Sequence, residues 1–457
     1  MSVLHIGVLY GFNRNRNYLD VFQRENEGNI MNYSEAVKYI ENAGRLGSIL
    51  GLSRMEKLCD LLGNPQNELS VIHIAGTNGK GSIGAMIGSI LTASGCKCGM
   101  YYSPALTGIT DHFVINSIPI NKKSYAHCVS KVAQANKLLK DEIGEEATQF
   151  EIETAVAFVY FAENHCDAVV IECGLGGRDD ATNVIKEKTL CVFASISFDH
   201  TEILGSTIGA IADVKSGIIT CPCPVVMIDS GSEAVEAIRN RCLEYNAALT
   251  VVRREDISGT CDFPVGEWVT YGKFKDVRVN LSGTFQRNNA AVAIEAARAL
   301  RERYNIRDCD IVKGLNDVKW PFRFEVISDN PLTIVDGAHN PGAADVLRQT
   351  ILERLSGRRI IFVVGMFKDK DCESVLSRIL DLGEKVITVT TPNKARALSA
   401  ENLAAMASKY NKSVDISNSV ENSKAKAISE AGKIGEKAVI VAFGSLSYLS
   451  EFKNGKS

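Results

Sequence analysis

The chain has 457 residues, about three times the ~150 typical of one domain, so two or three domains are expected. Hydrophobic residues at 45%, charged residues at 23% and a net charge of −3 describe a soluble globular protein and exclude the basic surface of a nucleic-acid-binding protein. No apolar run reaches the ~18 residues of a membrane span, and the thirteen cysteines fit reduced thiols in the cytoplasm.

Residues 1–30 differ in composition from the rest of the chain. Their one apolar patch, residues 3–10, lacks the basic lead-in and small-residue cleavage site of a signal peptide. The segment is interpreted either as an extra strand, as a disordered tail, or as untranslated sequence before a true start at Met31. Residues 27–31 can be encoded by GAA-GGA, six nucleotides and ATG, the form of a bacterial ribosome-binding site. We treat residues 1–30 as an extension outside the folded chain.

From Met31 onward, apolar runs of strand length alternate with helical segments. The predicted strands cover residues 70–75, 168–171, 190–198, 225–229, 332–335, 359–364, 385–390 and 438–443. The predicted helices include residues 82–94, 154–164, 289–304 and 343–355. Continuous Val and Ile runs separated by helices are typical of parallel strands covered on both faces. The sequence therefore predicts two α/β domains with mostly parallel sheets, joined near residues 317–320.

Polar residues follow four of the predicted strands directly. They are the Gly-rich segment 76–82, Glu172, the pair Asp199 and His200, and Asp336. In open parallel sheets, ligands bind outside the carboxyl ends of the strands. Four such placements predict one shared active-site crevice.

The Gly-rich segment predicts a phosphate-binding loop. It consists of Gly76, Thr77, Asn78, Gly79, Lys80, Gly81 and Ser82. Its glycines let backbone N–H groups converge on phosphate oxygens at a helix N-terminus, while Lys80 can reach the terminal phosphates and Ser82 can ligate Mg²⁺. The segment departs from GxxxxGK[ST], because Gly81 separates the Lys from the Ser. The alternative is a tight strand-to-helix turn without a ligand.

Other candidates have structural alternatives. Glu172, beside a glycine turn, suits a hard cation, but such a carboxylate also caps helices or forms ion pairs. His200 is either a ligand or a structural histidine. Lys215 is by default a solvated helix lysine, and it could bind a metal only if carbamylated, which burial would favour. Asp336, in the string Asp-Gly-Ala-His-Asn-Pro that contains His339, is either a ligand contact or a helix cap.

Taken together, residues 75–82 and 336–341 resemble the Mur ligase superfamily, and within it the folylpolyglutamate and dihydrofolate synthases. Further matching segments are residues 102–104, 150–151, 174–183, 197–204, 285–290, 320–323, 368–371 and 444–446. The resemblance runs in order from about Met31 to Tyr448.

This resemblance implies a P-loop ATP-binding ligase domain over residues 31–318 and a smaller Rossmann-like glutamate-ligase domain over residues 319–457. It also implies ATP and two Mg²⁺ ions as cofactors. The implied metal ligands are Ser82 and Glu172 for one ion, and His200 with carbamylated Lys215 for the other. The implied nucleotide contacts are the loop 76–82, Asn289, Arg323, Asp336 and His339, and the implied catalytic residues are Lys80, Arg323 and His339. Phe150 and Glu151 belong to the region that shapes the substrate side.

The implied reaction joins L-glutamate to the carboxylate of a reduced folate through an acyl phosphate, with dihydropteroate as a second acceptor, in a cytoplasmic monomer that binds neither nucleic acid nor membrane. No side-chain nucleophile is needed, because positioning and charge neutralisation carry the catalysis. The alternatives are another amino-acid ligase of the superfamily and a non-catalytic nucleotide-binding protein. Only 45 residues separate Met31 from Gly76, which argues against the cell-wall ligases with their preceding UDP-binding domain.

The sequence departs from the family pattern at four positions. Ala105 replaces a His, Asp111 and His112 replace a Glu-Arg pair, and Phe322 replaces the Gly of a W-P-G-R string. The first three lie in the loop expected to touch the pterin-bearing substrate, so they bear on acceptor preference.

Overall fold

The structure is a computed structural model that describes residues 30–44, 51–106, 108–263, 265–393 and 396–455. The extension predicted over residues 1–30 lies outside these ranges apart from Ile30. Within the described ranges, no helix has both the length and the apolar character that crossing a membrane requires.

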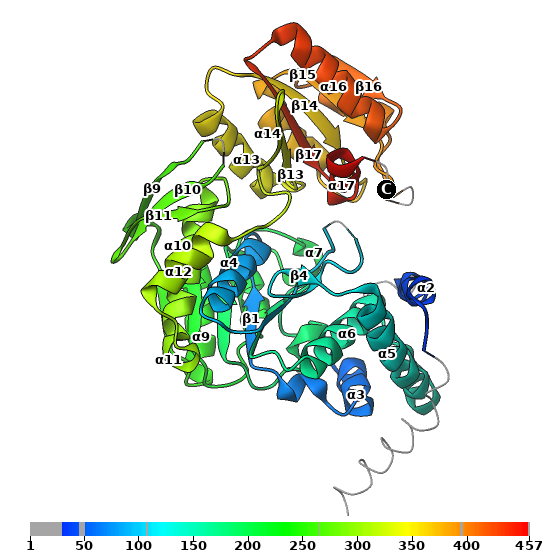
Figure 1. Cartoon of the computed structure of the whole chain (residues 1–457), viewed down its shortest axis with the longest axis vertical. Helices are drawn as coiled ribbons and strands as arrows, with labels where there is room; N and C mark the ends of the chain where they lie inside the picture. The colour runs from blue at the N-terminus through cyan, green and yellow to red at the C-terminus, as the bar shows by residue number, and fades with distance from the viewer. Residues whose placement is uncertain (1–29, 45–50, 107, 264, 394–395, 456–457) are drawn as a thin grey trace, which may run out of the picture.

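An eight-stranded sheet forms the centre of the first part of the chain, in the order β4-β3-β2-β5-β1-β6-β7-β8 (Figure 1). Its strands are β1 (Val71–Ala75), β2 (Cys98–Tyr101), β3 (Phe113–Ile115), β4 (Ile118–Pro119), β5 (Ala168–Glu172), β6 (Leu190–Phe193), β7 (Val225–Ile228) and β8 (Leu249–Val252). The six strands from β2 to β8 in this order are parallel, and β3 and β4 add an antiparallel edge. Both faces of β1 are buried, as expected for its mainly apolar sequence, in which the one polar residue, His73, is hydrogen-bonded to Thr182.

Helices cover both faces of this sheet. On one face lie α4 (Lys80–Ala93), α10 (Phe285–Ala299) and α12 (Asp308–Asp317), with the short α11 (Arg301–Tyr304) after α10. On the other lie α2 (Tyr33–Ala43), α3 (Ser53–Leu61), α5 (Lys122–Ile143), α6 (Gln149–Glu163), α8 (Ile208–Ser216) and α9 (Ser232–Glu244). Single turns complete this part, namely η2 (Pro65–Glu68), η3 (Ala181–Val184), α7 (Thr201–Leu204) and η4 (Arg254–Asp256).

Two further sheets come later in the chain. Strands β9 (Ile257–Cys261), β10 (Glu267–Tyr271) and β11 (Phe274–Val279) form a small antiparallel sheet that the sequence did not predict. The last sheet has the order β12-β13-β17-β14-β15-β16 and is parallel except for β12. Its strands are β12 (Glu325–Asp329), β13 (Leu332–Asp336), β14 (Arg359–Gly365), β15 (Gly383–Val389), β16 (Val414–Ser417) and β17 (Ala438–Gly444).

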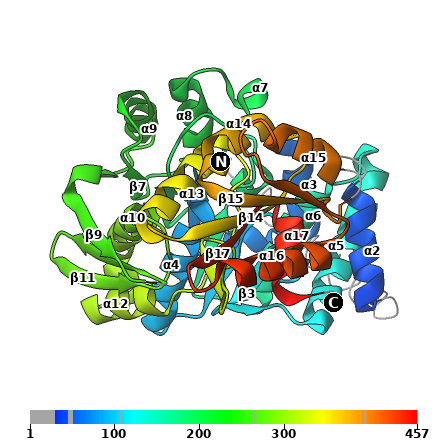
Figure 2. The ribbon, with the colours of Figure 1, turned by 90° about the horizontal axis from the view of Figure 1, so that it is seen from above.

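The six-stranded sheet is also covered on both faces. One face carries α13 (Pro341–Arg354), α14 (Cys372–Ile379), the turn η5 (Leu380–Leu382) and α15 (Ala400–Ala407), and the other carries α16 (Val420–Ile434) and α17 (Leu446–Asn454). Seen from above, β14, β15 and β17 lie across the first part of the molecule (Figure 2). The mixed α/β class with mostly parallel sheets is confirmed.

Some predicted boundaries were wrong. The strand predicted over residues 190–198 ends at Phe193, because the Ser195 carbonyl turns to accept the N–H groups of Thr77 and Asn78 at 2.7 and 3.3 Å. The helix predicted from residue 154 begins at Gln149, behind a capping box in which Thr148 and Glu151 bond each other's backbone N–H groups. Tertiary contact and capping, respectively, outweigh the apolar pattern at these two ends.

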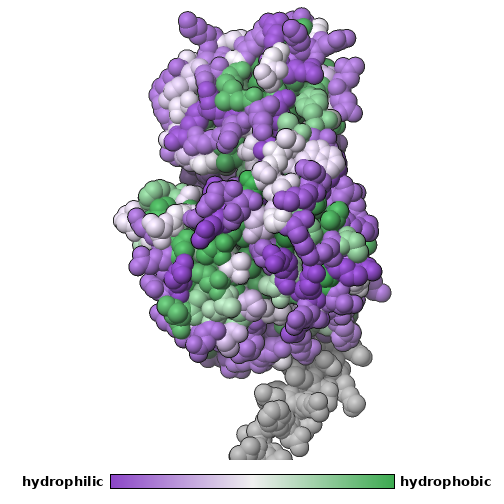
Figure 3. All heavy atoms as spheres, turned by 90° about the vertical axis from the view of Figure 1, so that its left-hand side faces the viewer, coloured by the Kyte–Doolittle hydropathy of each residue, from purple (hydrophilic) through white to green (hydrophobic). Residues whose placement is uncertain are grey.

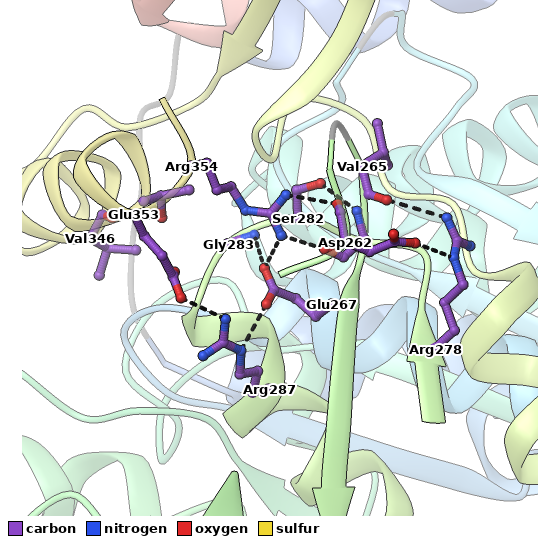
Figure 4. Close-up of polar contacts among 12 residues, drawn as sticks. Asp262, Val265, Glu267, Arg278, Ser282, Gly283, Arg287, Val346, Glu353 and Arg354 are labelled. Atoms are coloured by element: carbon purple, nitrogen blue, oxygen red, sulfur yellow. Dashed lines mark hydrogen bonds and ion pairs between the residues drawn. The ribbon is translucent and has the colours of Figure 1, made fainter. Parts of the chain in front are cut away.

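Buried charges tie the end of α13 to the small sheet and α10 (Figure 4). Arg354 pairs with Glu267, and both side chains are 0% exposed. Arg354 Nη1 donates to the Asp262 carbonyl at 3.1 Å. Arg287 bridges Glu267 at 2.7 Å and Glu353 at 2.8 Å. We call Asp262, Glu267, Arg287, Glu353 and Arg354 the charge joint, since it connects the six-stranded sheet to the preceding part of the chain.

Candidate active site

A cleft of about 960 Å³ lies between the eight-stranded and six-stranded sheets. In the space-filling view, the outline of the molecule narrows between these two parts (Figure 3). The cleft is lined by most of the predicted site residues, namely Thr77, Asn78, Gly79, Lys80, Gly81, Ser82, Glu172, His200, Asn289, Arg323, Asp336 and His339. Gly76 and Lys215 do not line it. The strand-end residues therefore meet at one crevice.

The Gly-rich loop is fixed by close neighbours. Gly79 begins α4 with φ +97°, a left-handed conformation that favours glycine. A Cβ at Gly79 would lie 2.7 Å from Asn289 Oδ1, and one at Gly81 would lie 2.5 Å from the Trp320 ring. Glycine is therefore required by contacts with two distant segments as well as by the turn itself.

Lys80 and Lys215 approach the same backbone oxygen. The Gly76 carbonyl accepts hydrogen bonds from Lys80 Nζ at 3.3 Å and from Lys215 Nζ at 3.0 Å. Burial, together with the nearby charge of Lys80, lowers the pKa of Lys215 to about 8. Lys215 therefore lies directly behind the loop. Its lowered pKa means that a larger fraction of its amine is neutral near pH 7 than in a solvated lysine.

Glu172 lies in register beside Ile74, so its carboxylate stands next to the loop that follows β1. Its Oε1 is 3.7 Å from Lys80 Nζ. Burial raises the pKa of this carboxyl, while Lys80 and Arg323 oppose the rise. The cations of the cleft thus favour its ionised form.

Asn289 and Ser82 are linked through Gln286 at the start of α10. Asn289 Nδ2 donates to Gln286 Oε1 at 2.9 Å, and Gln286 Nε2 donates to Ser82 Oγ at 3.3 Å. Gln286 is fully buried and does not line the cleft. Gln286 therefore fixes the position of the Asn289 side chain relative to that of Ser82.

The six-stranded sheet contributes the opposite wall. Asp336, at the end of β13, accepts N–H groups from Phe324 and Ala338, both at 2.8 Å. Burial raises its pKa, which the charge of Arg323 opposes. His339 Nδ1 lies 2.8 Å from the Gly337 carbonyl and so carries the proton, and burial lowers the pKa of His339 to about 4. Asp336 thus fixes the backbone at Phe324, next to Arg323, and at Ala338, in the turn after β13, while His339 presents a neutral ring.

The side chains that could ligate a metal differ in how they are placed in the cleft. Ser82 and Glu172 both line the cleft and offer the oxygen ligands that Mg²⁺ prefers. The His200 side chain is 44% exposed, with Nε2 at 3.8 Å from Asp199 Oδ1. No group of three His, Cys, Asp or Glu side chains suited to a metal occurs in the part of the chain that the structure describes. The residues therefore fit an ion whose coordination shell is completed by oxygen atoms of a bound molecule.

The family departures lie in two places. Ala105 and His112 line the cleft, and Asp111 accepts the Gly108 N–H at 2.8 Å in the same loop. Phe322 is buried at 0% exposure and adopts φ +57°, a left-handed value that bulky residues rarely take. It does not line the cleft. Only the loop departures therefore bear directly on the ligand.

Sequence reasoning missed several residues of the site. Asp180 accepts the N–H groups of Leu175 at 2.8 Å and Thr182 at 3.0 Å, which fixes the glycine turn after Glu172. Its signals were its place in the family-like segment 174–183 and before a short helical turn, where Asp often caps. Gln286 lies in the family-like segment 285–290 but was given no role, and the cleft-lining Glu153 gave no signal, because it lies in an ordinary helical sequence. Glu151, by contrast, pairs with Arg54 at 2.9 Å and does not line the cleft.

Comparison with known proteins identifies the class. Residues 74–297 match the Mur ligase middle domain, and residues 322–446 match the Mur ligase glutamate ligase domain. The dihydrofolate synthase/folylpolyglutamate synthase of Bacillus subtilis is 33% identical over 92% of this chain and 98% of its own length. The resemblance seen in the motifs is confirmed.

Two solved structures agree. A folylpolyglutamate synthase from Mycobacterium tuberculosis, complexed with ADP and AMPPCP, has a TM-score of 0.83 at 26% identity and covers 93% of this chain and 100% of its own. The FolC protein of Escherichia coli, in complex with DHPP and ADP, has a TM-score of 0.79 at 26% identity. The match covers 92% of this chain and 96% of the FolC chain. The chain belongs to the folylpolyglutamate and dihydrofolate synthase family of ATP-dependent Mur ligases.

Proposed function

We propose that the cleft binds ATP, a pteroyl acceptor and L-glutamate, and that the protein adds glutamate to the acceptor carboxylate. The observation that carries this proposal is the phosphate-type loop at α4, facing Arg323 and His339 across one cleft. Similar proteins solved with ADP and AMPPCP support a nucleotide at this place. The bifunctional name of the Bacillus subtilis relative supports both a reduced folate and dihydropteroate as acceptors.

The loop and its surroundings would hold the nucleotide. Backbone N–H groups of residues 76–82, at the positive end of α4, suit the phosphates. Lys80 adds a point charge beside the transferred phosphoryl group, while Asn289 and Arg323 contact ATP from opposite walls. Asp336 contributes by fixing the backbone around Arg323, and His339 by a neutral ring at the same wall.

A ligase of this class activates a carboxylate in two steps. The acceptor carboxylate oxygen attacks the γ-phosphorus of ATP, the bond to the bridging oxygen breaks, and ADP leaves with an acyl phosphate formed. The amine of glutamate then attacks the acyl carbon, loses a proton, and phosphate departs as the amide forms. Lys80 and Arg323 neutralise the oxygens on which charge develops, so no side chain needs to bond the substrate.

Magnesium is part of the proposal. Ser82 and Glu172 would hold one ion, and His200 with a carbamylated Lys215 would hold the second. When bound, Mg²⁺ supplies charge neutralisation on phosphate oxygens. The buried position and lowered pKa of Lys215 support carbamylation, since the neutral amine is the form that reacts with CO₂.

The organisation of the chain is proposed along the same lines. Residues 31–318 act as the P-loop ligase domain and residues 319–457 as the glutamate-ligase domain, in a cytoplasmic monomer. The thirteen free cysteines support a reducing compartment. Mass spectrometry of the native protein tests the start at Met31, and light scattering tests the monomer.

A phosphate-release assay tests the function. Release should require ATP, L-glutamate and a pteroyl acceptor together, and chelation by EDTA should stop it until Mg²⁺ is restored. Tetrahydrofolate and dihydropteroate are assayed separately, to resolve one activity from two. Failure with every pteroyl acceptor would contradict the folate assignment, and ATP binding without glutamate-dependent release would indicate a non-catalytic protein.

A further inference from the structure

One carboxylate of the cleft has no role in the ligation chemistry. Glu153, on α6, lines the cleft at 7% exposure. Its Oε1 accepts a hydrogen bond from Gln149 Nε2 at 2.8 Å, and Gln149 lines the cleft as well. In the described part of the chain, Glu153 forms no ion pair with a lysine, arginine or histidine. A buried carboxyl held by one neutral amide is unusual, since buried charges are normally paired.

The Glu153 carboxylate lacks a neighbouring group that compensates its charge. Burial raises the pKa of Glu153 to about 7, which shows that its charge is poorly compensated by the protein. A ligand that donates hydrogen bonds to the carboxylate would stabilise that charge. Glu153 also differs from Glu172, whose charge is supported by Lys80 and Arg323.

A buried histidine, His112, lines the same cleft. The Nδ1 of His112 lies 3.2 Å from the Tyr102 carbonyl, which can only accept, so Nδ1 carries the proton. Nε2 is buried and forms no hydrogen bond of ordinary geometry among the described residues, although the Ile109 backbone also interacts with the ring. Burial lowers the pKa of His112 to about 4, so the ring is neutral at physiological pH. This part of the cleft therefore offers the Glu153 carboxylate as an acceptor and no positive charge from His112.

The remaining walls here are apolar and aromatic. Ala105, Leu106 and Ile109 line the cleft. Behind them, the His112 ring contacts Phe113 at 4.3 Å and Tyr101 at 5.7 Å between ring centroids. An apolar wall with a few placed polar groups suits a flat, uncharged heteroaromatic ring. It does not suit the carboxylate end of the acceptor, which Lys80 and Arg323 would attract.

The 2-amino-4-oxopyrimidine edge of a pterin ring has the complementary pattern. Its 2-amino group and N3–H are two parallel donors, as in one face of a guanidinium, which carboxylates accept in pairs. We propose that Glu153 is a specificity-determining residue that accepts these two hydrogen bonds, and so selects pteroyl acceptors by their amino-pyrimidine edge. This inference rests on the proposed function, because that function supplies the pteroyl acceptor.

The test compares Glu153→Gln with wild type in steady-state phosphate release. The variant keeps the shape and can still bond Gln149, but its amide offers one acceptor in place of two. The KM for the pteroyl acceptor should rise about 10- to 100-fold, as expected for a site that leaves buried donors unpaired. The KM values for ATP and glutamate should stay unchanged. Glu163→Gln, at a more exposed carboxylate of the same helix that pairs with Lys131, is the matched control.

Acceptor analogues give a second measurement that needs no variant. Wild type should prefer the natural acceptor over its 2-desamino-2-methyl analogue by a similar factor, and Glu153→Gln should have lost most of that preference. An unchanged acceptor KM in Glu153→Gln, or equal use of both acceptors by wild type, overturns this inference while leaving the proposed function intact. Absence of turnover by wild type with every pteroyl acceptor overturns both.

Discussion

The six-stranded sheet meets the rest of the chain at the cleft and at the charge joint, and buried charges are paired differently at the two places. In the charge joint, Arg354 and Glu267 are fully buried against each other, and Glu267 is paired with Arg287 as well. In the cleft, Lys80 lies 3.7 Å from Glu172, and Arg323 has no ion pair within the described residues. Charges satisfied by the protein hold the structure together, whereas charges left short of partners are available to a ligand.

The largest expected effect comes from removing a charged side chain of the cleft. Lys80→Ala should lower kcat/KM for phosphate release by at least about 10²- to 10³-fold, because in the proposed mechanism Lys80 neutralises the transferred phosphoryl group. The loss should be the same for every acceptor, since the proposed function places Lys80 at the nucleotide and not at the acceptor. The thermal unfolding midpoint should stay close to that of wild type.

Lys437→Ala, at an exposed lysine far from the loop in sequence, is the control for Lys80→Ala and should leave turnover unchanged. Retained activity in Lys80→Ala would refute the phosphate role. A large fall in the stability of Lys80→Ala would instead show that Lys80 stabilises the fold, as the charges of the charge joint do.

The charge joint should show the opposite response. Glu267→Gln leaves Arg354 and Arg287 facing a neutral amide in a buried place, so the free energy of unfolding should fall by about 3 kcal/mol in denaturant titration. The kcat/KM of the folded enzyme should change little. Glu384→Gln removes the same charge from the exposed pair with Arg359 and should cost at most about 1 kcal/mol. Equal effects of the two variants would show that the joint carries no special stability.

Phe322, in the segment that links the two parts, should give the smallest effect. Replacing it with Gly relieves a left-handed backbone worth about 1–2 kcal/mol but removes a buried ring worth about 3–5 kcal/mol. The variant Phe322→Gly should therefore be destabilised by about 2 kcal/mol, although the family pattern has Gly there. Phe322→Ala keeps the strain and should be less stable still. A Gly variant more stable than wild type would mean that strain outweighs packing.

The sequence predicted which residues line the cleft where the signal lies in the local sequence. Glu172 and Asp336 could be predicted to line a cleft because each ends a parallel strand, one in each large sheet, and the carboxyl edges of both sheets face the same cleft. The loop 76–82 was found because its glycines and Lys80 fall within one turn of chain. Fold class was predicted for the same reason, from continuous apolar runs.

Long-range pairings could not be predicted. Arg354 and Glu267 are separated by 87 residues, and nothing in either local sequence indicates the other. Lys215 was suggested only through the family resemblance, since its bond to the Gly76 carbonyl spans 139 residues. The end of β6 was misplaced because Ser195 pairs with the loop rather than with a strand. These features depend on tertiary contacts that a periodicity does not contain.

The glycines of the Gly-rich loop 76–82 have one more consequence. The missing side chains at Gly76, Gly79 and Gly81 leave space for Ala194, Asn289 and Trp320 respectively, each from a different segment. The motif therefore reflects three distant neighbours as much as the needs of a turn. Grafted alone into another protein, the seven residues would lack the surfaces that shape them. A transplant of nucleotide binding would have to carry those three partners with it.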